Sequence, residues 1–149
     1  MNGHLAALAR RFWDTLMEAS PTFATLLGDH RFDDRFEDLS REEEDRLIGL
    51  LDGFVSEAAA IEPGGLDRED RVTRRALMFE ASSQADLLRN RAAEFAVDPM
   101  IGIHMEIVSS IPQIAPADAG QADALVAKAS RTGVMFDQAM ERLRQGVAT

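Results

Sequence analysis

The segment from Leu26 to Ser40 reads LLGDHRFDDRFEDLS, and the signals at its two ends decide how the surrounding chain folds. Gly28 is typical of the left-handed residue that ends a helix, because glycine has no Cβ to clash there. Ser40 is followed by Glu43, which is the spacing of a capping box at a helix start. Between these ends the apolar residues follow neither a helical nor a strand period. The segment is therefore predicted to be a charged loop that joins two helices.

Two helices are predicted before this loop. Apolar residues at spacings of three and four indicate an amphipathic helix that ends near Ala19. They are Leu5, Leu8, Phe12 and Leu16. Ser20 and Pro21 then have the order of an N-cap and a first helical residue, where a missing N–H costs nothing. A short second helix is therefore expected to run from this proline to Gly28.

Two longer helices are predicted after the loop. The first begins at Ser40, carries apolar residues to Ile61, and is stopped by a Pro-Gly-Gly sequence at 63–65. The second is capped by Asp67 and runs to about Ala92. Its expected core face includes small residues, which suits close contact with a neighbouring helix. The positions of this face are Val72, Ala76, Phe79, Ser83 and Leu87.

The C-terminal third combines an irregular pattern with a helical one. Residues 95–116 are apolar and are interrupted by three prolines, so they predict an irregular, partly buried connector. Two helices follow, Ala119–Arg131 and Val134–Gln145, with Thr132-Gly133 between them. The whole pattern predicts an all-α fold of five or six antiparallel helices in a single helical domain, residues 1–149.

Composition and charge exclude several classes of function. The chain has 149 residues, of which 46% are hydrophobic, and a net charge of -10. A globular fold is therefore expected, without the basic stripe that binds nucleic acid or an anionic membrane. Because there is no cysteine, disulfides, thiolate nucleophiles and cysteine-ligated zinc are excluded. No window reaches the ~20 apolar residues of a membrane span, and no signal-peptide core is present, so a cytoplasmic protein is expected.

No catalytic motif is found in the sequence. It contains no H-E-x-x-H, G-x-S-x-G, P-loop or G-x-G-x-x-G pattern. His104 and Glu106 could share one face of a strand as a pair of metal ligands, but a solvated or backbone-bonded polar pair is the favoured interpretation. We accordingly predict no catalytic, cofactor-binding or metal-ligating residue in this chain.

The loop itself offers oxygen and nitrogen ligands at short range, which raises the question of an ion site. The calcium-loop pattern D-x-[DN]-x-[DN]-G with a closing glutamate is not present in it. Arg31 and Arg35 lie among its aspartates and can neutralise them through charge-assisted hydrogen bonds. A network of aspartates and arginines is therefore favoured over an ion site, with Phe32 and Phe36 as apolar anchors. The residues of interest are Gly28, Asp29, His30, Arg31, Asp33, Asp34 and Arg35.

The same loop carries a resemblance to a known family. The chain resembles the bacterial domain-of-unknown-function 885 (DUF885) family nearly end to end, and residues 28–35 match its signature loop. The matching positions before the long helices are Phe12-Trp13, Pro21, Ala24-Thr25, Leu27 to Arg35 and Asp38-Leu39-Ser40. Those further along are Ile61 with Asp70, Gly102-Ile103-His104 and the closing FDQAMERLRQGVA.

The resemblance implies a larger protein. Members of the family are typically several times longer, largely helical and similar to zinc-dependent peptidases, with a histidine–glutamate metal motif far downstream of the region matched here. By that comparison residues 1–149 correspond to an N-terminal fragment that is inactive by itself, and zinc is expected only in longer members.

Two kinds of partner follow from these expectations. A fragment is expected to contact its missing C-terminal portion, or a second copy of itself, through an exposed apolar patch. The alternative is an autonomous acidic helical module that binds a basic protein partner through a helix groove.

Overall fold

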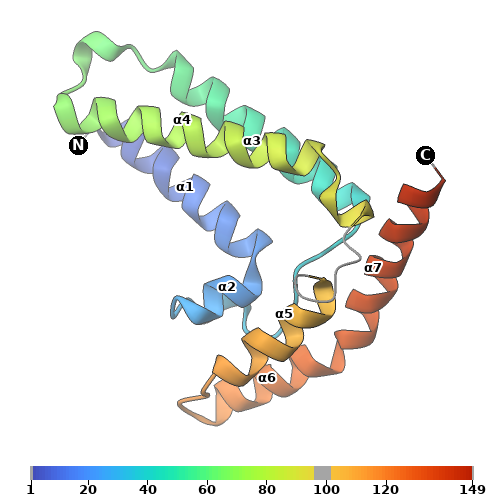
Figure 1. The fold of residues 1–149 in the computed structure, drawn as a ribbon. Helices are drawn as coiled ribbons and strands as arrows, with labels where there is room; N and C mark the ends of the chain where they lie inside the picture. The colour runs from blue at the N-terminus through green and yellow to red at the C-terminus, as the bar shows by residue number, and fades with distance from the viewer. Residues whose placement is uncertain (1, 96–101, 149) are drawn as a thin grey trace. The chain divides into compact units, whose positions relative to one another are not determined.

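This computed structural model describes residues 2–95 and 102–148, which form seven α-helices and four short 3-10 helices, with no strand among them (Figure 1). The prediction of an all-α chain is confirmed. The α-helices are α1 (Gly3–Ala19), α2 (Pro21–Leu26), α3 (Arg41–Ala60), α4 (Arg68–Arg89), α5 (Ile103–Ser110), α6 (Ala119–Ser130) and α7 (Thr132–Val147). The 3-10 helices are η1 (His30–Phe32), η2 (Pro63–Gly65), η3 (Ala92–Glu94) and η4 (Ile111–Gln113). Within these described ranges, none of the helices has the length and apolar character needed to cross a bilayer.

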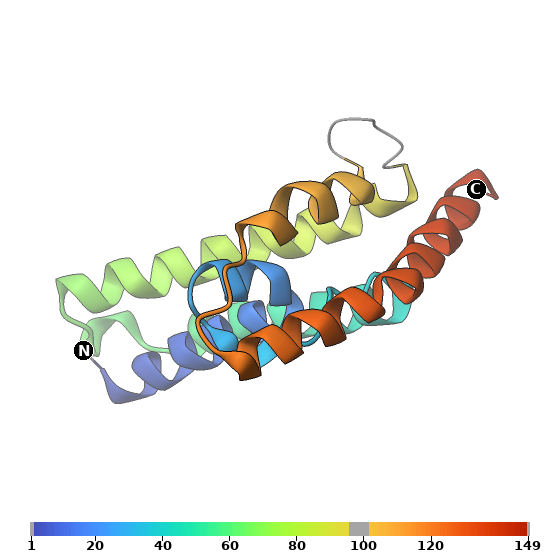
Figure 2. The same ribbon diagram turned by 90° about the horizontal axis from the view of Figure 1, so that it is seen from below.

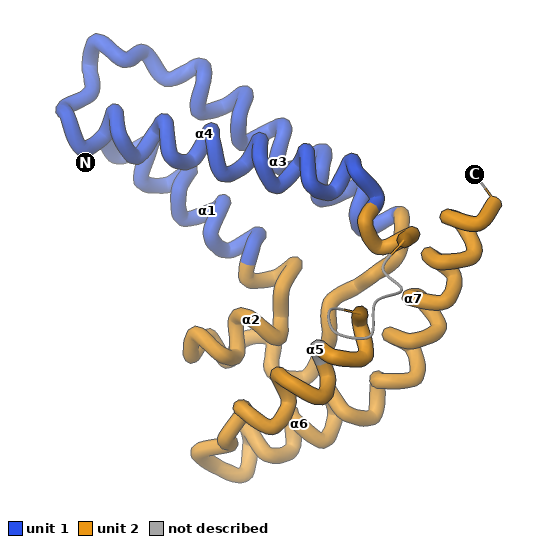
Figure 3. Tube along the Cα trace, viewed as in Figure 1, with its two compact units in different colours: residues 1–16, 42–91 blue, residues 17–41, 92–149 orange. Residues whose placement is uncertain are grey.

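The chain divides into two compact units (Figure 3). Unit 1 comprises Met1–Leu16 and Glu42–Arg91, so it holds most of α1 together with α3 and α4. Unit 2 comprises Met17–Arg41 and Ala92–Thr149, so it holds α2, the loop, and α5 to α7. Each unit is thus assembled from segments that are far apart in the sequence.

Apolar side chains from three helices form the core of unit 1. They are Leu8 and Phe12 of α1, Leu51, Phe54 and Ala58 of α3, and Leu77, Ala81 and Ala85 of α4. The rings of Phe12 and Phe54 meet edge to face, with centroids 5.5 Å apart and an interplanar angle of 78°. This geometry adds an attraction between the rings to the effect of burial. The buried face predicted for α1 is therefore confirmed.

The predicted core face of α4 is wrong. Val72, Phe79 and Leu87 are exposed, whereas Leu77, Ala81 and Ala85 are buried against α1 and α3. Helix α4 carries apolar residues on two opposite faces. The helical spacing of apolar residues indicates both faces, but it does not predict which of them is buried. The structure buries the face with the two fully buried alanines, whose small side chains let the neighbouring helices approach closely.

Polar contacts fix the ends of the helices in unit 1. Asp67 accepts a hydrogen bond from the backbone N–H of Asp70, which confirms it as the predicted N-cap of α4. Arg74, one turn after Asp70, donates from Nε to the carbonyl oxygen of Ala58 at 2.7 Å and from Nη2 to that of Ala59 at 2.9 Å. These bonds satisfy carbonyls that the end of α3 leaves without helical partners.

The segment predicted as an irregular connector contains a helix. Residues 103–110 form α5, which begins after Gly102. Pro112 does not interrupt it, because this proline lies in the first turn of η4, where its missing N–H is tolerated. Residues 96–101 of the predicted connector lie outside the described residues.

The last two helices do not form the expected antiparallel pair. Only Arg131 separates α6 from α7, and its φ of -91° and ψ of 0° are close to helical values. The chain therefore continues from α6 into α7 instead of folding back along it (Figure 2). Gly133, which we expected to separate them, lies inside α7, since a single glycine weakens a helix without ending it.

A buried charge cluster packs α7 against η3 within unit 2. The carboxylate of Glu94 in η3 pairs with Arg41 and lies 3.5 Å from Nη2 of Arg142 in α7. Close by, Gly146 of α7 lies so near the backbone of Glu94 that an added Cβ would be 2.3 Å from its carbonyl oxygen. Lys128 of α6 is also fully buried, with its ammonium 5.2 Å from the centroid of the Phe36 ring.

Candidate functional site

The signature loop begins where α2 ends in a Schellman motif. Gly28 has a φ of +86°, the left-handed conformation that favours glycine. The N–H of Asp29 donates to the carbonyl of Ala24 at 2.9 Å, and the N–H of Gly28 donates to that of Thr25 at 3.0 Å. Both bonds satisfy carbonyls at the end of the helix. The glycine stop predicted from the sequence is confirmed.

The C-terminal part of the longer loop segment, residues 26–40, contacts the start of α2. Ser20 occupies the N-cap position, as predicted, but its side chain makes no capping hydrogen bond. Instead, the carboxylate of Glu37 accepts bonds from the backbone N–H and the hydroxyl of Thr22, each 2.9 Å long. A carboxylate has two charged oxygens, so it satisfies both donors at once. The two ends of the loop are thus tied to one short helix.

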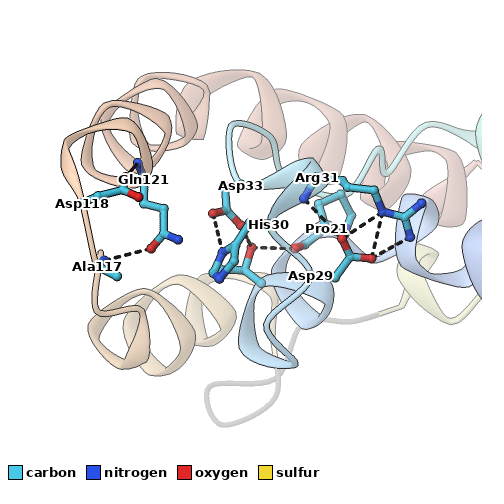
Figure 4. Close-up of polar contacts among 9 residues, drawn as sticks. Pro21, Asp29, His30, Arg31, Asp33, Ala117, Asp118 and Gln121 are labelled. Atoms are coloured by element: carbon cyan, nitrogen blue, oxygen red, sulfur yellow. Dashed lines mark hydrogen bonds and ion pairs between the residues drawn. The ribbon is translucent and has the colours of Figure 1, made fainter.

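Asp33 is the buried centre of the loop (Figure 4). Its Oδ2 lies 2.8 Å from Nδ1 of His30, and its Oδ1 accepts a 2.7 Å bond from the hydroxyl of Thr25. That hydroxyl also lies 3.0 Å from the carbonyl oxygen of Pro21, one turn earlier in α2. Both oxygens of Asp33 are therefore engaged, and the carboxylate orients the imidazole ring of His30.

Asp29 and Arg31 form an exposed, two-pronged ion pair on the same loop. Arg31 donates from Nε to Oδ1 of Asp29 at 2.9 Å and from Nη2 to Oδ2 at 2.7 Å. The hydrogen bond from Arg31 lowers the pKa of the Asp29 carboxyl below its ordinary value. Because the pair is exposed to solvent, we expect it to shape the loop more than it stabilises the fold.

Asp34 and Arg35 are more loosely connected. Nε of Arg35 is 3.9 Å from Oδ1 of Asp34, and Nη1 of Arg131 is 3.6 Å from Oδ2 of the same carboxylate. The guanidinium of Arg35 lies over the ring of Phe32, 5.0 Å from its centroid. Phe32 and Phe36 are both buried, as expected of the two apolar anchors.

The predicted network of aspartates and arginines is confirmed for Asp29 with Arg31 and, at longer range, for Asp34 with Arg35. Asp33 departs from it, because its partners are His30 and Thr25. Asp33 follows His30 by three positions, so the turn of η1 places the two side chains on the same side. This pairing was not predicted from the sequence, because the apolar residues of the loop show no helical period that would indicate η1.

The loop is also tied to α7 through Gln138. Its side-chain Oε1 accepts a 3.1 Å bond from the N–H of Leu39, and its Nε2 donates a 2.9 Å bond to Asp38. One glutamine amide thereby satisfies a donor and an acceptor of an extended segment that lacks secondary structure of its own. Nothing in the local sequence indicates this contact, since the partners are about a hundred positions apart.

A cavity of about 250 Å³ lies beside His30 within unit 2. Its walls come from the end of α2, the loop, η4 and the first two turns of α6. The lining residues are Thr25, Leu26, Gly28, His30, Asp33, Gln113, Ile114, Ala115, Gln121 and Leu125. Gln113 and Gln121 had no signal in the sequence that linked them to the loop, whereas Thr25 was noted only as part of the Ala24-Thr25 pair in the family resemblance. The signature loop thus contributes one side of a partly polar cavity.

The other histidine considered as a ligand is not among the residues that line this cavity. His104 is an exposed residue of helix α5, so the strand geometry that would have paired it with a carboxylate is not formed. Across residues 2–95 and 102–148, no three histidine, aspartate or glutamate side chains are grouped closely enough to hold a metal ion.

One comparison with known proteins gives a match. The model of a family described as "Bacterial protein of unknown function (DUF885)" matches residues 21–149. The match includes the whole signature loop and every described helix from α2 to α7. No curated protein and no solved structure matches the chain significantly.

Proposed function

The chain belongs to the bacterial DUF885 family, and on that premise we propose that residues 1–149 act as a helical region that is inactive by itself and packs against further protein. The partner is the C-terminal portion of a longer family architecture, which the resemblance described above likens to zinc-dependent peptidases. The role of this region is then to support or cover a site that other residues complete.

The observation that carries this proposal is the outer face of α4. Val72 is 63% exposed, Phe79 is 70% exposed and Leu87 is 66% exposed. They are about two helical turns apart, so they lie along one side of α4, opposite the face that packs in unit 1. We call Val72, Phe79 and Leu87 the outer stripe. Fully covering one such side chain contributes roughly 1.5–3 kcal/mol, which favours a bound partner.

Exposed apolar residues are also present in the last third of the chain, within unit 2. They are Phe95, Val108, Val126, Val134, Met140 and Val147. Single exposed apolar residues are ordinary on any protein surface. Their number, together with the outer stripe, supports a chain that buries more surface in its working form.

The signature loop supports the same proposal through its bonding. Asp29 is bound by Arg31, and Asp33 is bound by His30 and Thr25, so two of its three aspartates are closely engaged within α2 and the loop itself. Such bonding suits a segment that holds a fixed shape.

The second candidate is an autonomous acidic interaction module. The net charge of -10 favours it, because such a surface attracts a basic partner in a salt-sensitive manner. In this case the chain works as it stands, and its outer stripe need not be covered by a catalytic portion.

Size-exclusion chromatography with light scattering separates these candidates. A region with an uncovered stripe is expected to self-associate reversibly as its concentration rises, and Phe79→Asp should reduce that association. A chain that stays monomeric at every concentration, with the same profile for Phe79→Asp, would favour the autonomous module.

A further inference from the structure

We propose that the cavity beside His30 binds a neutral amide group through one hydrogen-bond acceptor and one donor on facing side chains. The inference concerns a ligand site that is independent of the outer stripe and of the proposed role. His30 and Gln121 each use one polar side-chain atom in a hydrogen bond within the protein, and each has a second polar atom left to bind a ligand.

His30 supplies the acceptor. A carboxylate can only accept, so the Nδ1 atom that lies 2.8 Å from Asp33 carries the ring proton. In the neutral imidazole the other nitrogen, Nε2, then has a free lone pair. Thr25 donates a hydrogen bond to the other oxygen of Asp33, which holds the carboxylate in the orientation that binds Nδ1 of His30. His30 lines the cavity, and its half-exposed ring is accessible to a ligand.

Gln121 supplies the donor. The backbone N–H of Ala117 can only donate, and it bonds to the side-chain oxygen of Gln121 at 2.8 Å. The amide end of Gln121 that remains is therefore the NH₂ group. Asp118 caps α6 through the backbone N–H of the same residue, which anchors it in the first turn. Figure 4 shows the side chains of Gln121 and His30 pointing toward each other.

A second acceptor lines the cavity. Gln113 donates from Nε2 to the carbonyl oxygen of Ser109 at 2.6 Å, which identifies its other end, Oε1, as the acceptor. Leu26, Ile114 and Leu125 supply apolar surface around these polar groups. A cavity of about 250 Å³ corresponds to roughly eight water volumes, enough for an amide with a few carbons attached.

An amide fits this set of groups better than a charged ligand does. Its carbonyl oxygen accepts from Gln121 while its N–H donates to His30. A carboxylate has no hydrogen to give to Nε2 and would lie near the buried Asp33 carboxylate. An ammonium has no lone pair to accept the hydrogen bond from Gln121. Each mismatch leaves a polar group of the cavity unpaired.

Three probes of matched shape test the proposal: isobutyramide, isobutyrate and isobutylamine. Each is titrated at mildly alkaline pH, where a histidine is ordinarily neutral, while NMR follows the Gln121 side-chain NH₂ and the His30 ring. We expect saturable shifts with isobutyramide and at least about tenfold weaker binding of the two charged probes. N-methylisobutyramide, a secondary amide, then distinguishes a peptide backbone from a primary carboxamide as the source of the group.

Gln121→Glu is the decisive variant, because it keeps the oxygen that accepts from Ala117 and replaces the NH₂ donor with a second oxygen. Glutamate at the third position of a helix is well tolerated, so the fold should persist. We expect isobutyramide to bind about tenfold more weakly to this variant, and binding to be unchanged in Gln84→Glu, a control with the same change of charge on α4.

Several results would overturn the proposal. They are the absence of saturable shifts with isobutyramide, equal or tighter binding of isobutyrate or isobutylamine, and an unchanged affinity of Gln121→Glu for the amide. If Gln121→Glu did not fold, the relative affinities of the three probes for the unsubstituted chain would still test the proposal.

Discussion

The carboxylate of Glu94 lies 3.5 Å from the guanidinium of Arg142, and both side chains are almost completely buried. Glu94 belongs to η3 and Arg142 to α7, so this pair joins two segments of unit 2 that are about fifty positions apart in the chain. Arg41, the first residue of α3, pairs with the same carboxylate. One buried acid therefore organises three separate segments.

Replacing Glu94 with glutamine should destabilise unit 2. The substitution keeps the size of the side chain but leaves the buried Arg142 charge without this carboxylate, and removing one partner of a buried pair typically costs about 3 kcal/mol or more. Urea unfolding followed by circular dichroism measures the change. Glu141→Gln, at an exposed position that pairs with Arg144, is the control and should change stability by less than about 1 kcal/mol. Equal effects of the two variants would contradict the importance of the buried pair.

Gly146→Ala should also destabilise the packing of α7 on η3. The added Cβ would lie 2.3 Å from the carbonyl oxygen of Glu94, so backbone must shift, at a cost of about 1–3 kcal/mol. Gly133→Ala in the same helix meets nothing within 4 Å and should be neutral or stabilising by up to about 1 kcal/mol. Thermal unfolding of both variants gives the comparison. If the two shifted the midpoint in the same direction, the close approach at Gly146 would be disproved.

Thr25→Val tests the hydrogen bond from α2 to Asp33, the buried centre of the signature loop. Valine has nearly the same shape as threonine but gives no hydrogen bond to Asp33, so an unsatisfied buried oxygen should cost about 1–3 kcal/mol. Thr73→Val on α4 is a matched control and should stay within about 0.5 kcal/mol of the unsubstituted chain. A cost no larger than that of the control would indicate that Asp33 does not depend on this hydroxyl.

The pair of Asp29 with Arg31 predicts a pH dependence. Its hydrogen bond lowers the pKa of the Asp29 carboxyl in the folded chain, so any stability from this group is present above the ordinary aspartate pKa. That stability is lost as the pH falls through the lowered folded value. Carboxyl carbon NMR should show Asp29 titrating below an ordinary aspartate, and Arg31→Gln should raise its midpoint. An unchanged midpoint in that variant would contradict the pairing.

Much of the fold could be predicted from local sequence signals. Gly28, with its missing Cβ, and Asp67, with its capping carboxylate, mark helix ends that the structure confirms. The outer stripe was mistaken for core because α4 has two apolar faces, and the choice between them depends on α1 and α3. Helix α5 was missed because β-branched residues and a nearby proline disguise a short helix.

The candidate site was less predictable than the fold. The loop was identified from its own residues, but the role of Asp33 depends on Thr25 in the preceding helix. Gln121 and Gln113 reach the cavity only through tertiary packing, and a glutamine has no sequence context that reveals which of its two ends remains free. Such long-range contacts are not encoded in any local pattern.

The proposed role is tested most directly by titrating the chain with the portion of a longer DUF885 protein that carries the histidine–glutamate metal motif, expressed without the region equivalent to residues 21–149. We predict saturable binding that Phe79→Asp weakens at least about tenfold, since it removes an apolar contact worth roughly 1.5–3 kcal/mol. Leu50→Asp, at an exposed apolar position of α3 that belongs neither to the outer stripe nor to the exposed residues of unit 2, should bind like the unsubstituted chain. No saturable binding, or equal effects of the two substitutions, would contradict the account.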